Sequence, residues 1–147
     1  LEFTEGNVTD YDFIQARILE CAEKYNIRVI NYDRWNSSSL VASLLNEGAP
    51  MNSFGQGFAS MSPVVKSLEK MIIGRELNHG NNPLLDWAMS NVQAKTDPAG
   101  NVKFDRGKST EKIDPAISLC MAIGGYMDEQ MDGGESSTYD DRGLIMI

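Results

Sequence analysis

Residues 27–35 constrain the fold most, because a run of β-branched and aromatic side chains ends there in an aspartate, an arginine and a tryptophan. The run is typical of a buried strand, and Asp33 follows it directly. Loops at the carboxyl ends of strands in open α/β sheets hold polar groups over a rigid scaffold, so Asp33 is a candidate functional residue. Alternatively, Asp33 caps the following helix or pairs with Arg34.

A chain of 147 residues suits one domain with one core. No apolar run approaches the roughly 20 residues of a membrane span, and no secretory signal is visible. We therefore expect a cytoplasmic protein with no membrane contact. Because the first residue, Leu1, is apolar and is not methionine, we expect residues 1–3 to end a strand that begins upstream, in a longer protein.

The cysteines and the single histidine argue against a zinc site. Cys21 and Cys120 lie among apolar neighbours without a CxxC motif, and we expect both to be reduced core residues. His79 has no cysteine nearby in sequence and is typical of a turn. Any bound metal should therefore be a hard cation held by oxygen.

Apolar side chains at spacings of three and four predict five helices: residues 10–25, a helix capped by Asn36 or Ser37 that ends at Gly48, one opening near Ser62 and Pro63, one after Asn82, and one from about 109 to 127. Short strands are predicted at residues 50–54 and, as a hairpin, at 92–96 and 102–104. Strand, helix and strand in this order indicate an α/β fold.

The predicted helix faces and the C-terminal region complete this outline. We expect Leu45 and Ile72 to face the core on their helices. Residues 1–127 should form the domain, and residues 128–147, rich in acids, glycine and serine, should form a flexible acidic tail.

The net charge of −8 is unevenly distributed along the chain. Acids dominate residues 128–147, whereas bases outnumber acids between residues 95 and 112. This basic strip is our candidate surface for DNA phosphates, although lysines on a solvated hairpin can serve solubility alone. Its cations are Lys95, Lys103, Arg106, Lys108 and Lys112.

Asp114 is the second candidate acid, because it opens a helix that is apolar on nearly every side. We expect its carboxylate to lie close to the core and to need a partner there, such as a divalent cation. The alternative is an N-cap followed by Pro115 at the first helical position. Asp33 and Asp114 together suit a two-metal phosphodiesterase site, with carboxylates within about 8 Å of each other.

The GKST segment and the two tryptophans look like ligand-binding features, but a structural role explains each of them more simply. The sequence GKST at residues 107–110 ends like a phosphate-binding loop, but that loop needs Gly or Ala where the chain has Val102, which argues against ATP binding. Trp35 and Trp87 could stack on bases, but single tryptophans beside apolar helices are more often core or rim residues.

Several motifs in order resemble the C-terminal nuclease domain of the large terminase subunit of tailed bacteriophages and prophages. They are GNVTDYDFI at residues 6–14, YDRW at 32–35, FGQGF at 54–58, NPLLDW at 82–87 with SN at 90–91, and STEKID at 109–114. The resemblance implies a ribonuclease H-like mixed sheet flanked by helices. It also implies a Mg²⁺- or Mn²⁺-dependent endonuclease that cuts concatemeric viral DNA during packaging, with Asp33 and Asp114 as catalytic, metal-binding acids.

The resemblance further implies double-stranded DNA as substrate, with an ATPase motor domain, the portal and the small terminase subunit as partners in the host cytoplasm. No motor motif is present in this sequence, and the family's first catalytic aspartate lies upstream of it. We therefore expect an incomplete sheet that lacks its first strand or strands, and weak or no activity in this chain, unless an acid such as Glu111 or Asp86 is the third ligand. The alternatives are a noncatalytic assembly module and a resolvase-like nuclease.

Overall fold

The computed structural model describes residues 7–34 and 38–134. In chain order the elements are α1 (Tyr11–Lys24), β1 (Ile30–Tyr32), α2 (Ser38–Asn46), β2 (Met51–Ser53), α3 (Phe58–Ile73), α4 (Pro83–Asn91), β3 (Ala94–Thr96), β4 (Val102–Phe104) and α5 (Asp114–Gly134). The predictions for residues 1–3, for Trp35, for the cap at Asn36 or Ser37 and for residues 135–147 fall outside the described residues.

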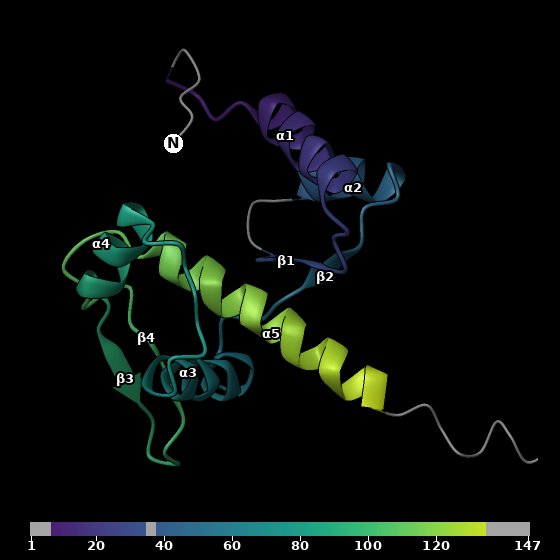
Figure 1. The fold of residues 1–147 in the computed structure, drawn as a ribbon. Coiled ribbons are helices and arrows are strands. Elements are labelled where there is room, and N and C mark those ends of the chain that lie inside the picture. The colour runs from purple at the N-terminus through teal and green to yellow at the C-terminus, as the bar shows by residue number, and fades with distance from the viewer. Residues whose placement is uncertain (1–6, 35–37, 135–147) are drawn as a thin grey trace, which may run out of the picture.

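Helix α5 runs across the molecule and is contacted on two sides (Figure 1). On one side lie β1 and β2, with α1 and α2 beyond them, and on the other lie α3 and α4 with the β3–β4 hairpin. The two pairs of strands form separate sheets, β1–β2 parallel and β3–β4 antiparallel. The predicted strand-helix-strand unit and the α/β class are confirmed, although β1 is half-buried rather than buried.

Two adjacent glycines of α5 allow the parallel strands to approach the helix closely. A Cβ atom on Gly124 would lie 2.4 Å from the ring of Phe54, and one on Gly125 would lie 2.5 Å from the side chain of Val29. Real Cβ contacts are never this short, so the packing requires glycine at both positions. The start and middle of β1, the strand that Asp33 follows, are thereby held against α5.

The main core lies between α3, α4, β4 and α5. Its largest fully buried side chains are Met61, Leu68 and Cys120, and burial raises the pKa of the Cys120 thiol to about 12. Cys120 is therefore the reduced core residue that the sequence predicts, whereas Cys21 is only half-buried. Leu44 of α2 is also fully buried.

Local sequence signals explain several helix ends. Asp10 caps α1 by accepting a hydrogen bond from the Phe13 amide, and Asn82 caps α4 by accepting from two amides of its first turn. The prediction that α3 opens near Ser62 is wrong, since α3 begins at Phe58 after Gly57. The buried Ser62 hydroxyl instead accepts from the Val102 amide of the hairpin.

Three further expectations are corrected. Leu45 is 52% exposed because it lies at the margin of its helix's apolar face. Ile72 is 48% exposed because it lies in the last turn of α3, beyond the buried Leu68. The tail was predicted to begin at Asp128, but α5 continues to Gly134. An ion pair of 2.7 Å between Arg28 and Glu129 ties this last part of the helix to the segment before β1.

No helix among the described residues is long and apolar enough to cross a membrane.

Candidate active site

Asp33 lies where the sequence predicts it, directly after β1 at the carboxyl end of the parallel strands. The half-buried side chain lines a cavity of about 250 Å³. The polar residues that share this cavity come from the β2–α3 connection, the hairpin and the loop after it: Gln56, Lys95, Lys103, Asp105 and Arg106. Segments far apart in the sequence therefore place one half-buried acid beside three cations.

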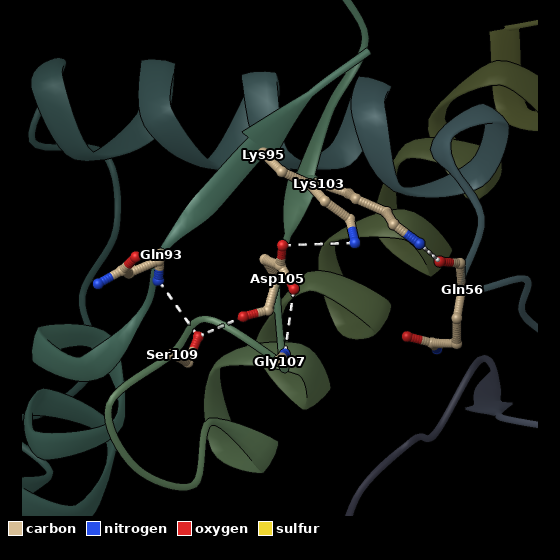
Figure 2. A network of polar contacts seen from close by, with 7 residues as sticks. All are labelled: Gln56, Gln93, Lys95, Lys103, Asp105, Gly107 and Ser109. Atoms are coloured by element: carbon tan, nitrogen blue, oxygen red, sulfur yellow. Dashed lines mark hydrogen bonds and ion pairs between the residues drawn. The ribbon is translucent and has the colours of Figure 1, made fainter.

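Lys95 and Lys103 are directly opposite each other on β3 and β4. Like charges in this position repel, but each ammonium group has a separate acceptor. The Lys95 Nζ lies 3.4 Å from Oδ2 of Asp105, and the Lys103 Nζ donates to the Gln56 carbonyl at 3.0 Å (Figure 2). Lys103 also lies over the Phe58 ring, 5.1 Å from its centre. Both cations are thus held at the cavity by named contacts.

Asp114 lies in the first turn of α5, as predicted, but the helix begins at Asp114 and not near residue 109, and the environment of Asp114 also differs from the expectation. Its side chain is 66% exposed, so the prediction of a carboxylate close to the core is wrong. The preceding Ile113 and the following Ala116 turn inward, which leaves the Asp114 side chain in solvent. Its Oδ1 atom lies 3.6 Å from the Arg106 guanidinium, a cation that lines the Asp33 cavity.

Arg106 therefore connects the two candidate acids, but Asp114 is not among the residues that line the Asp33 cavity. The predicted separation of about 8 Å between the two carboxylates stays a prediction. Lys108 and Lys112 are not part of this cavity either; they lie on the segment between Arg106 and α5. Of the five predicted DNA-binding cations, three thus lie around Asp33.

Asp105 is the residue of this site that sequence reasoning missed. It is 8% exposed and follows directly after β4, as Asp33 follows β1. Burial tends to raise the pKa of its carboxyl group, but the Gly107 amide and the Lys95 ammonium outweigh burial and hold that pKa below its usual value. The available signal was an aspartate two residues before a glycine at a strand end, which is typical of a turn closed by the side chain.

The GKST segment at residues 107–110 closes a turn, which agrees with the argument that it is not a phosphate-binding loop. The Gly107 amide donates to Oδ1 of Asp105 at 3.0 Å, and the Ser109 hydroxyl donates to the Asp105 carbonyl at 2.7 Å (Figure 2). These groups close a turn and are not directed at a ligand. His79 lies in the connection before α4 and is 3.4 Å from Asp86.

The acids suit a hard cation only in part. Within residues 7–34 and 38–134, no three His, Cys, Asp or Glu side chains are grouped so that they could hold a metal ion. Mg²⁺ is commonly bound by one or two carboxylates, with substrate phosphates and water as the remaining ligands. A single carboxylate such as Asp33 is compatible with an ion bound in that way, whereas Asp114 is not among the residues that line the same cavity.

The comparisons with known proteins agree with the resemblance seen in the motifs. Residues 1–130 match the family model described as the terminase large subunit, endonuclease domain. The large terminase subunit of Enterobacteria phage HK97 is 32% identical over 99% of this chain and 30% of its own length. Protein YmfN of Escherichia coli (strain K12) is 29% identical over 86% of this chain and 28% of its own.

A solved structure supports the same assignment. The crystal structure of the HK97 bacteriophage large terminase matches with a TM-score of 0.75 and 32% identity, over 82% of this chain and 26% of that one. The chain thus spans about a third or less of the length of these relatives. The structural match agrees with the predicted ribonuclease H-like α/β fold. By the family model and the structure together, the chain belongs to the endonuclease domain family of the large terminase subunit.

Proposed function

We propose that this domain is a Mg²⁺- or Mn²⁺-dependent endonuclease that cuts concatemeric viral DNA during genome packaging. The observation that carries the proposal is the Asp33 cavity, where a half-buried carboxylate at the end of a parallel strand lies beside Lys95, Lys103 and Arg106. A carboxylate beside several cations suits a phosphodiester substrate, because the cations bind phosphate and the acid binds a metal ion. Membership of the terminase endonuclease family supports the same reading.

Asp33 and Asp114 are the residues that would hold the metal ions. When bound, a pair of such ions activates a water molecule and stabilises the leaving oxygen. Arg106 contacts Asp114 and also lines the Asp33 cavity, which supports a role for its guanidinium in binding a phosphate group of the DNA. Lys95 and Lys103 would bind neighbouring phosphates, and Lys108 and Lys112 would bind the strand farther from the cavity.

The whole protein's setting belongs to the same proposal. The substrate is double-stranded DNA, and the partners are an ATPase motor domain, the portal and the small terminase subunit. The place of action is the cytoplasm of the bacterial host. The HK97 relative, named as a terminase large subunit, supports this setting.

Manganese binding tests the proposed metal site. We expect Asp33→Asn and Asp114→Asn each to weaken Mn²⁺ binding by about 10-fold or more, as measured by calorimetry. In a chain extended upstream to include the first strand and its aspartate, each should also stop Mn²⁺-dependent nicking of a supercoiled plasmid. Asp12→Asn is the matched control, because Asp12 is an exposed aspartate in the first turn of α1 as Asp114 is in α5. If all three variants bind Mn²⁺ like the wild type, the two acids are caps and the proposed site is wrong.

The alternative function is a noncatalytic docking module of the packaging motor. One observation favours it: an apolar groove of about 320 Å³ between α1 and the β1 strand, lined by Phe13, Ile14, Arg17, Ile18, Cys21, Ile27 and Ile30. Grooves of this kind often bind another protein segment. Metal binding separates the two functions, since a docking module does not need Mn²⁺ at Asp33.

A further inference from the structure

Asp105 is held near the candidate site by several main-chain hydrogen bonds. Its main-chain amide donates to the Gln93 carbonyl at 2.7 Å, and its carbonyl accepts from the Ser109 amide and hydroxyl at 2.9 and 2.7 Å. These main-chain contacts fix the residue between the hairpin and the loop that leads to α5 (Figure 2). These bonds involve only the amide and the carbonyl of Asp105, so its carboxylate is not needed for them. Any further role of the carboxylate comes from the contacts of its two oxygens.

The two carboxylate oxygens of Asp105 make different contacts. Oδ1 accepts from the Gly107 amide at 3.0 Å, and Oδ2 lies 3.4 Å from the Lys95 Nζ. The first contact closes a turn around Arg106, the residue between Asp105 and Gly107. The second holds Lys95 away from Lys103, its like-charged neighbour on the opposite strand. One side chain thus places two of the three cations around Asp33.

We infer that Asp105 is a positioning residue of the nuclease site, which orients Arg106 and Lys95 toward the phosphates of bound DNA without contacting the DNA or a metal ion itself. The inference rests on the proposed function. Because both oxygens already have donors within the protein, Asp105 is poorly placed to be a metal ligand. A positioned cation contributes more to the rate of cleavage than to binding, since its geometry matters most in the transition state.

Asp97 offers a matched control on the same hairpin. Its Oδ1 accepts from the Ala99 amide at 2.9 Å and from the Asn101 amide at 2.8 Å, so it closes a turn by the same chemistry. It lies in the connection between β3 and β4 and does not line the Asp33 cavity. Replacing either aspartate removes one negative charge from the hairpin, but only Asp105 contacts Lys95.

The test uses Asp105→Ala, Asp105→Asn, Asp97→Ala and Asp97→Asn, with Mn²⁺, in a chain extended upstream to include the first strand and the aspartate that the family resemblance implies. DNA affinity is measured by fluorescence anisotropy, and cleavage is measured with the protein in excess over plasmid. We expect Asp105→Ala to lower the rate at saturating protein by about 10- to 100-fold. Asp105→Asn, which keeps an acceptor for Gly107, should have a smaller effect. In every variant DNA binding should be unchanged or tighter, because one repulsive charge is lost.

The Asp97 variants should bind DNA as the Asp105 variants do and should cleave it at the wild-type rate. Equal rates for Asp105→Ala and Asp97→Ala would overturn the inference, as would a loss of Mn²⁺ binding in Asp105→Asn, which would make Asp105 a ligand. If Asp105→Ala does not fold, Asp105→Asn must show the lowered rate with unchanged affinity. Failure of the proposed function is distinct, because a wild-type extended chain without Mn²⁺-dependent cleavage reveals it before any variant is compared.

Discussion

The side-chain amide of Asn31 donates a hydrogen bond of 2.6 Å to the main-chain carbonyl of Met121, 90 positions later in the chain. Its Oδ1 atom accepts from the Asn52 side chain at 2.7 Å. Asn31 therefore connects β1 with both β2 and α5, two residues before Asp33. This polar contact and the glycine pair of α5 hold the same strand by different means.

The first prediction concerns this contact. Asn31→Ala should lower the free energy of unfolding by about 1–3 kcal/mol, since both hydrogen bonds of a half-buried side chain are lost. Urea denaturation measures the change. Asn52→Ala is the control, because it removes only the contact with Asn31 on the exposed side and should cost less than Asn31→Ala. Equal losses would mean that the bond to Met121 contributes nothing to stability.

The second prediction concerns the glycine pair. Gly124→Ala should destabilise the fold by about 1–3 kcal/mol, because the added methyl group meets the Phe54 ring and outweighs the higher helix propensity of alanine. Phe54→Leu alone should also destabilise by leaving a void. In the double variant the two losses should be less than additive, by at least about 0.5 kcal/mol. Strict additivity in denaturation curves would show that the helix moves instead.

The third prediction follows from the lowered pKa of Asp105. Because its folded-state pKa lies below the ordinary value of 3.8, the folded protein binds fewer protons than the unfolded chain in this range. The stabilisation by this carboxylate is therefore fully present above that value and is lost as the pH falls through the folded-state pKa. Asp105→Asn should lack this component. The stability difference between wild type and variant should shrink as the pH is lowered from 6 to about 2.5, a change that thermal denaturation can follow.

The fourth prediction concerns the basic strip. Replacing Lys103, Arg106 and Lys108 by alanine should weaken DNA binding and flatten its dependence on salt, by about one unit of slope for each lost phosphate contact. A triple alanine variant at Lys24, Lys66 and Lys70, on α1 and α3, carries the same charge change elsewhere. It should keep a slope closer to that of the wild type. Identical slopes for the two triple variants would show that the DNA lies on another face.

Local chemistry made part of this structure predictable. The caps at Asp10 and Asn82 and the hairpin follow from short-range hydrogen bonding, which a sequence shows directly. The start of α3 was misplaced because Pro63 resembles a first-turn proline, whereas the helix tolerates it one turn further in. The hydroxyl of Ser62, which looked like a cap, pairs with a strand 40 residues away.

In the candidate site, too, local sequence predicts some features, and tertiary packing determines the others. The position of Asp33 followed from one strand and its end, but the cations around it depend on how the hairpin packs against α3. Asp105 was overlooked because its burial results from those tertiary contacts, and residues 95–112 read only as a charged strip. The exposure of Asp114 was misjudged because one side chain in the first turn of an apolar helix can face solvent while its neighbours Ile113 and Ala116 turn inward.

Helix α5 also sets the spacing between Asp114 and the strand that Asp33 follows. Asp114 is its first residue, and the carbonyl that anchors β1 belongs to Met121, seven residues later in the helix. At about 1.5 Å per residue, these two points are roughly 10 Å apart along the axis. Inserting one residue between them would turn Asp114 by about 100° around the helix relative to the strand that carries Asp33. The proposed site therefore requires a fixed length of this segment in addition to its apolar character.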